Sequence, residues 1–229
     1  MIVQDFNIEQ MDLKYSVGIN QIRIDLDQFI EVNNLTDEEE ALNYLFKIIE
    51  DLQNKNKETI IQIFRDNFVL NQDHIFVACY YLQKALFHEA LISNKKSIEL
   101  LLYLSTFRQI NKGIKSFGVD AGILSNSAFI ICIISRKNNL NTIYNEILEN
   151  LKATEVKVSI NDLTSEKIKE IIKFYELSEL QIKSVLNSYG IKNANLAKPE
   201  INLQDISLAV FDLICEKMAL LNLEKARLG

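Results

Sequence analysis

Residues 99–118 constrain the fold of this chain more than any other stretch, because an apolar helical pattern runs directly into a basic amphipathic one. Residues 98–104 are apolar at almost every position, which predicts a buried helix. The second half predicts one apolar helical face, since its large apolar residues recur at every third or fourth position. These residues are Phe107, Ile110, Ile114 and Phe117.

Basic residues occupy the other side of the same predicted helix. Arg108, Lys112 and Lys115 recur at helical spacing and predict a basic ridge. Gly118 follows the last apolar position, where a left-handed residue can end a helix. The ridge is either a solvated helix face or a strip that binds phosphates, with an affinity that depends on salt.

The charge distribution favours the second interpretation. The 229-residue chain carries a net charge of −6, which argues against polyanion binding by bulk attraction. Residues 74–118, however, contain six Lys or Arg against Glu89 and Glu99. This segment is therefore +4 and the rest of the chain −10. A local basic surface on an acidic protein indicates a confined anionic partner.

Composition and cysteine usage indicate a globular, cytoplasmic protein. Apolar residues make up 48% and charged residues 24% of the chain, which argues against general disorder. The three cysteines sit in apolar runs without close spacing, as expected of reduced, buried thiols. The sequence begins without the pattern of a signal peptide, and the longest apolar run, 128–134, is too short to span a membrane. We therefore expect no membrane partner.

The remaining pattern predicts a single mixed α/β (α+β) domain over residues 1–229. It should have a small, mostly central sheet with helices packed around it and a long C-terminal helix. Strands are predicted at 15–24, 59–64, 128–135 and 156–160. Helices are predicted from 36 to about 50, 73–91, 140–151, 165–174, 178–189 and 205–225, with Thr36 and Asp73 as candidate N-caps. Pro199 marks the best candidate for a flexible loop.

Two helices have faces that allow alternative interpretations. In helix 73–91 the residues His74, Tyr81, Lys84 and His88 share a polar face. This face is either an ordinary surface or a wall on which an unpaired base could stack. In helix 205–225 two adjacent apolar stripes cover more of the circumference than one core contact needs. Met218 and Leu221, near the chain end, would be exposed without a partner, which favours docking.

Residues 99–118 resemble the small KEOPS-complex subunit, which is related to the p53-related protein kinase-binding protein. The matching positions are Glu99-Leu-Leu-Leu-Tyr103, Ser105-Thr-Phe-Arg-Gln-Ile110, Gly113-Ile114 and Gly118. Further matches are His74-Ile75 with Ala78, Asn94 and Glu216-Lys-Met-Ala-Leu-Leu221. Among the departures, Thr106 stands where the family usually has Gly, Lys95 replaces a Ser and Gly113 replaces an Ala. Residues 30–57 and 192–204 look like insertions.

The resemblance implies an α/β protein without catalytic activity. Such a protein docks on the small atypical kinase/ATPase of KEOPS, mainly through its C-terminal helix, and recruits tRNA by its 3′ CCA end. The complex then makes threonylcarbamoyl-adenosine through another subunit. On this interpretation the kinase contacts are Ile214, Lys217, Met218 and Leu221. The nucleic-acid contacts are Lys84, His88, Lys95, Arg108, Gln109, Lys112 and Lys115.

Two other classes of function compete with this one. The first is a protein-interaction module that regulates a kinase without binding RNA, its basic ridge being only solubilising. The second is a small-molecule enzyme, which is disfavoured because the sequence shows no paired acids, no nucleophile–base arrangement and no Gly-rich phosphate loop. We therefore expect no catalytic residues, no cofactor and no small-molecule substrate. Two histidines fourteen positions apart, with no Cys/His cluster, also make a zinc site improbable.

Overall fold

The computed structural model describes residues 1–191 and 202–226, so the predicted loop at Pro199 lies outside the described residues. The chain divides into two compact units. The sheet unit comprises Met1–Asp66, Lys95–Ile98 and Gly118–Ser159; the helical unit comprises Asn67–Asn94, Glu99–Phe117 and Ile160–Gly229. Each unit is described by itself, and a single domain over residues 1–229 stays a prediction.

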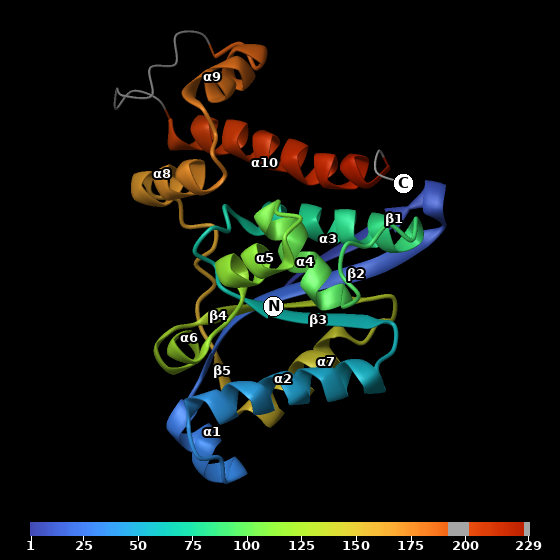
Figure 1. Ribbon diagram of the computed structural model, residues 1–229, viewed down its shortest axis with the longest axis vertical. Helices are drawn as coiled ribbons and strands as arrows, with labels where there is room; N and C mark the ends of the chain where they lie inside the picture. The colour runs from blue at the N-terminus through green and yellow to red at the C-terminus, as the bar shows by residue number, and fades with distance from the viewer. Residues whose placement is uncertain (192–201, 227–229) are drawn as a thin grey trace. The chain divides into compact units, whose positions relative to one another are not determined.

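The sheet unit contains five strands and four α-helices, and Figure 1 labels each of them. The strands are β1 (Ile2–Ile8), β2 (Leu13–Ile24), β3 (Thr59–Phe64), β4 (Phe129–Ser135) and β5 (Ala153–Glu155), and a short 3-10 helix, η1 (Glu9–Met11), joins the first two. The helices are α1 (Leu26–Asn33), α2 (Glu38–Lys55), α6 (Ala121–Asn126) and α7 (Leu140–Leu151).

The sheet is antiparallel throughout and has the order β1-β2-β4-β3, with β5 paired to the end of β2. The predicted strand in this Ile-rich run is confirmed as β4, and all seven of its residues are buried. Alternate β4 residues, Phe129, Ile131 and Ile133, enter one core with side chains of α2 and α7, as the two-residue period of a strand requires.

Helix α2 belongs to this core. Its N-cap is Asp37, whose side chain accepts a hydrogen bond from the Glu40 backbone, so the predicted cap at Thr36 is one residue too early. Ala41, Leu45, Ile49 and Leu52 of α2 are buried in the core. The segment 30–57 therefore contributes to folding the sheet unit, whether or not it is an insertion relative to the family.

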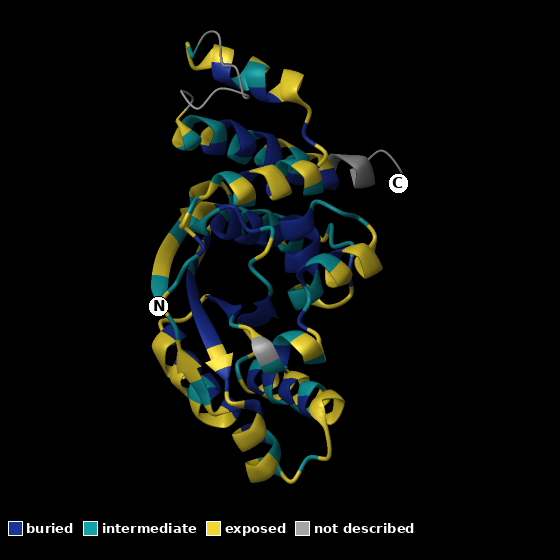
Figure 2. Cartoon of the chain, turned by 90° about the vertical axis from the view of Figure 1, so that its left-hand side faces the viewer, coloured by how far each residue is buried: buried dark blue, intermediate teal, exposed yellow. Residues whose placement is uncertain are grey.

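The helical unit consists of helices, most of which carry both buried and exposed residues (Figure 2). They are α3 (Gln72–Phe87), α4 (Lys96–Ser105, from Glu99 onward), α5 (Ile110–Phe117), α8 (Ser165–Phe174), α9 (Glu179–Ser188) and α10 (Leu203–Ala226). Helix α10 packs against α3, α8 and α9. In the described part of the chain no helix is both long and apolar enough to cross a bilayer.

Several element predictions are wrong in detail. Residues 156–160 are irregular, and the strand in this region is β5, which precedes them. Helix α3 is capped by Asn71, whose side chain accepts from the His74 backbone, and Asp73 lies in its first turn. Gly118 follows α5 as predicted, but the glycine with a positive φ in the described chain is Gly190.

Candidate functional site

The junction between α4 and α5 is a tight turn at Ser105 and Thr106. The Ser105 hydroxyl donates to the Leu102 carbonyl at 3.2 Å and accepts from the Phe107 backbone N–H at 3.3 Å. Thr106 donates its N–H to the Tyr103 carbonyl and has φ of 57°, in the left-handed region. The helix restarts only at Ile110, so residues 107–109 form a short connection instead of a helical ridge.

Four phenylalanine rings, including Phe107 of this connection, pack against one another in an aromatic cluster. The Phe174 ring stacks on Phe68 with centroids 3.9 Å apart, and Phe107 meets Phe174 edge-on at 5.6 Å. Phe117 packs edge-on against both Phe68 and Phe174. Aromatic pairs in these geometries add roughly 0.5–1.5 kcal/mol each beyond their burial. The cluster therefore fixes where the chain leaves α4 and enters α5.

His74 belongs to the interior and not to a polar surface. Its side chain is fully buried, with Nδ1 accepting from the Leu70 N–H and Nε2 donating to the Leu104 carbonyl, each at 3.2 Å. The Tyr175 hydroxyl donates to the same carbonyl at 2.6 Å. Burial lowers the pKa of His74 to about 4. The predicted base-stacking wall is thus wrong at His74.

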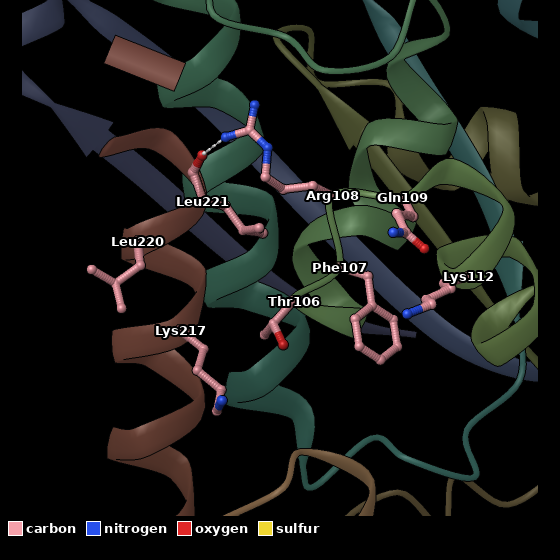
Figure 3. Close-up of a pocket in the computed structure, with 8 residues that line it drawn as sticks. All are labelled: Thr106, Phe107, Arg108, Gln109, Lys112, Lys217, Leu220 and Leu221. Atoms are coloured by element: carbon pink, nitrogen blue, oxygen red, sulfur yellow. Dashed lines mark hydrogen bonds between the residues drawn. The ribbon is translucent and has the colours of Figure 1, made fainter. Parts of the chain in front are cut away.

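A pocket of about 350 Å³ lies beside the α4–α5 turn, between that turn and α10 (Figure 3). It is lined by Thr106, Phe107, Arg108, Gln109, Lys112, Lys217, Leu220 and Leu221. Among these described lining residues three are cationic and none is acidic. The pocket joins Arg108, Gln109 and Lys112, predicted as RNA contacts, to Lys217 and Leu221, predicted as kinase contacts.

Two of the cations are held by contacts inside the helical unit. The Arg108 guanidinium donates from Nη1 to the Leu221 carbonyl at 3.2 Å, which Figure 3 shows as a dashed line. The Lys112 ammonium lies 5.7 Å from the centre of the Phe107 ring, within the range of a cation–π contact. The pocket therefore presents positive charge in fixed positions.

The outer surface of α5 differs from the prediction. Ile110 and Ile114 are 38% and 41% exposed, so within α5 the predicted apolar face is buried only at Phe117. The other buried residue of α5 is Gly113. A Cβ at Gly113 would come within 2.9 Å of Leu102 Cδ2, so glycine lets α5 lie close against α4. Because Arg108 precedes α5, the predicted ridge reduces to two exposed lysines, Lys112 and Lys115.

The other predicted RNA contacts do not line this pocket. Lys84 occupies the last turn of α3, and His88 follows that helix at an exposed position. Lys95 belongs to the sheet unit, where its ammonium lies 3.7 Å from the Glu50 carboxylate. The structure therefore brings three of the seven predicted nucleic-acid contacts together in the pocket.

The predicted kinase contacts are mostly core residues. Ile214 and Met218 are fully buried and Leu221 is nearly so, which makes the expected exposure of Met218 and Leu221 wrong. These side chains face the interior because α10 packs on three neighbouring helices. The exposed apolar residue in this part of α10 is Leu220, at 45%, beside the pocket-lining Lys217. The sequence alone does not predict this exposure, because Leu220 belongs to one of the two apolar stripes of the helix. The exposure follows from how α10 packs on its neighbours.

The described residues offer no metal centre, and the thiol of Cys215 is not activated. No group of three or more His, Cys, Asp or Glu there is placed to hold a metal ion. Burial, with Asp212 and Asp73 nearby, raises the pKa of Cys215 to about 12, so this thiol is not a nucleophile at neutral pH. The arrangement can bind anions by charge and hydrogen bonding.

Comparison with known proteins agrees with a binding role. No individual curated protein is similar enough to this chain to count as a match. A model of one family, described as kinase binding protein CGI-121, matches residues 29–222, which include both helical segments of the pocket. The match spans well over half of the 229 residues. The chain therefore belongs to the CGI-121 family of kinase-binding proteins.

Proposed function

We propose that this protein is a non-catalytic, cytoplasmic KEOPS subunit with two ligands. It binds the small kinase/ATPase of the complex, and it recruits tRNA through the 3′ CCA end for threonylcarbamoyl-adenosine modification. Membership of a kinase-binding family supports the first role. The pocket beside Thr106 supports the second, because three cations and an aromatic ring suit a single-stranded nucleic acid.

For the kinase we propose the outward face of α10, around Leu220. Leu220 is the large apolar side chain exposed there, with Glu216 also exposed one turn earlier. An apolar residue with charged neighbours on a helix suits docking into a partner's groove. Met218 and Ile214 would act indirectly, since their burial in the helical unit holds α10 in place.

For RNA, the observation that carries the proposal is the grouping of Arg108, Lys112 and Lys217 around Phe107 without an acidic neighbour in the described lining. Phosphate oxygens would bind the cations, and an unpaired base could stack on the partly exposed ring. A single strand fits this pocket better than a duplex, because stacking requires an unpaired base.

The test is equilibrium binding of labelled tRNA with and without its CCA end. We expect the intact tRNA to bind more tightly, and equal affinity for the two would refute recruitment through the 3′ end. The dependence on salt separates charge from shape, since each phosphate contact to a single strand contributes about 0.7 to the slope of log K against log salt.

Charge reversal at Lys112 provides the matching variant test. Lys112→Glu should weaken tRNA binding about tenfold at 0.1 M salt and reduce the salt slope by about one. Lys169→Glu is the control, because Lys169 is an exposed lysine on α8 outside the pocket and changes the net charge equally. If the two variants lost affinity equally, the effect would come from overall charge and not from the pocket.

A kinase-regulating module without RNA binding is the alternative function. The fixed positions of Arg108 and Lys112 in the helical unit allow a purely structural role for both cations. Co-purification with the kinase, with no tRNA binding at low salt, would establish this alternative.

A further inference from the structure

Thr106 has an unfavourable backbone conformation for its side chain. The described residues with positive φ that are not glycine are Asp12, Asn34, Glu89, Thr106, Lys152 and Glu176. Thr106, at 57°, is the β-branched member of this group. In the left-handed region a Cβ crowds the following carbonyl oxygen, and a branched Cβ is the least tolerant of this conformation. Glycine would adopt this conformation without strain.

The strained residue is held by its neighbours on both sides. Its N–H is bonded to the Tyr103 carbonyl, and the Ser105 hydroxyl bridges Leu102 and Phe107 across the turn. Ser105 is fully buried, so this arrangement is part of the packed interior. The turn therefore fixes the direction of the Thr106 side chain, and strain of this kind is frequent at binding sites.

The Thr106 side chain lines the cationic pocket. In Figure 3 its hydroxyl oxygen points toward the space near Lys217 and Phe107. Arg108 and Lys112 line the same pocket, so an anion bound there would be within reach of several cations. Cations supply charge at some distance, whereas a hydroxyl on a fixed turn supplies a directed hydrogen bond.

We propose that Thr106 is a ligand-contacting residue of this pocket, whose hydroxyl donates to a non-bridging phosphate oxygen of the bound strand. This inference rests on the proposed RNA-binding function and identifies a further contact within it. On this interpretation the strained threonine is kept because its hydroxyl binds, so stability and affinity should respond to substitution in opposite directions.

Three substitutions separate the hydroxyl from the strain. Thr106→Gly removes both, Thr106→Val keeps the branched shape without the hydroxyl, and Thr106→Ser keeps the hydroxyl without the branch. The measurements are the thermal midpoint of the free protein and the dissociation constant of the full chain for tRNA that carries its CCA end.

We expect Thr106→Gly to raise the midpoint by about 2–4 °C and to weaken tRNA binding about tenfold, the usual effect of losing one hydrogen bond to a charged group. Thr106→Val should weaken binding similarly without raising the midpoint. Thr106→Ser should bind within about twofold of the natural protein, because it retains the donor. If Thr106→Val does not fold, the comparison of Thr106→Gly with Thr106→Ser still decides, since both relieve crowding and only the serine can donate.

The outcomes distinguish this inference from the function on which it rests. If the natural protein binds tRNA and all three variants bind as tightly, the hydroxyl makes no contact and the inference is wrong while the proposed function stands. If Thr106→Ser loses as much affinity as Thr106→Gly, the threonine acts through its shape, which also overturns the inference. If the natural protein binds no tRNA, the proposed function and the inference fail together.

Discussion

The imidazole of His74 is enclosed by groups from three segments of the helical unit. The Leu70 N–H precedes α3, the Leu104 carbonyl ends α4, and the Tyr175 ring follows α8 at a centroid distance of 5.9 Å. Nδ1 accepts a hydrogen bond in this network and therefore carries no proton, so the ring is neutral in the folded protein. Burial and the nearby Lys167 both disfavour a second proton, and the pKa of His74 falls from 6.5 to about 4.

This pKa predicts that acid destabilises the helical unit. Between pH 6.5 and 4 the unfolded chain binds a proton at His74 that the folded chain does not, so stability is complete above pH 6.5 and declines as the pH falls toward 4. We expect the free energy of unfolding to fall by about 2 kcal/mol between pH 7 and pH 5 from this group alone. Urea unfolding at both pH values measures it.

The chain supplies its own control for this prediction, because it has two histidines. His74→Gln should remove most of the pH dependence, whereas His88→Gln should retain it, since His88 is exposed. A pH dependence that His74→Gln leaves unchanged would assign it to carboxyl groups.

The sequence alone does not predict where the side chains of His74 and Thr106 lie. Helical spacing puts His74 with Tyr81, Lys84 and His88, but its ring is hydrogen-bonded to Leu104, thirty residues away in sequence. For Thr106 the sequence shows only that a threonine stands where the family usually has glycine. Its φ of 57° and its place in a pocket depend on how the turn packs.

Among elements, α4 is held to the preceding loop by a buried carboxylate. Glu99 is fully buried and accepts hydrogen bonds from the Ile92 N–H, at 3.0 and 3.1 Å, and from the Ser93 N–H, at 2.7 Å. A carboxylate in the first turn of a helix also interacts favourably with the helix dipole. The loop after α3 therefore depends on one side chain of α4.

We predict that Glu99→Gln destabilises the protein by about 1–3 kcal/mol. An amide oxygen accepts weaker hydrogen bonds than a carboxylate, and the amide NH2 group would face the backbone N–H groups of Ile92 and Ser93, which are also donors. Thermal unfolding should show a midpoint about 2–10 °C lower. Glu216→Gln, at an exposed position of α10, is the matched control and should change the midpoint little. An unchanged midpoint in Glu99→Gln would mean that the loop does not need the charge.

Strong periodic or uniformly apolar patterns predicted elements well. Strand β3 and helices α7 and α8 begin and end where the pattern placed them, and β4 is one residue shorter than predicted. Strand β1 was not predicted. Four of its seven residues are exposed, so it lacks a clear apolar alternation and is defined by pairing with β2. The spacing of Phe107 and Arg108 predicts helix because both positions fit a helical period, but residues 107–109 form a connection without helical structure.

At the scale of the whole molecule, the cations of the predicted basic segment, residues 74–118, do not form one site. Lys95 belongs to the sheet unit, whereas Arg108 and Lys112 line the pocket of the helical unit. The net charge of −6 and the local excess of cations are properties of sequence, but only Arg108 and Lys112 of that segment line the pocket. The third cation, Lys217, comes from α10, more than a hundred residues later. Local composition therefore indicated an anion-binding surface, whereas the actual set of cations depends on how α10 packs.

The two proposed ligands should be separable, because the kinase is proposed to bind an apolar side chain and tRNA the cations and the ring of the pocket. Leu220→Asn should weaken binding of the kinase about tenfold or more, since it replaces an exposed apolar contact by a polar one. It should leave tRNA affinity within about threefold, because Leu220 lines the pocket but contributes neither charge nor an aromatic ring. Lys112→Glu should have the reverse effect. Dissociation constants of both variants for each purified ligand test this. A Leu220→Asn protein with full kinase affinity would move the docking surface away from the outer face of α10. Loss of both ligands in both variants would mean that kinase and tRNA compete for one surface, in which case a complex of all three could not form through this pocket.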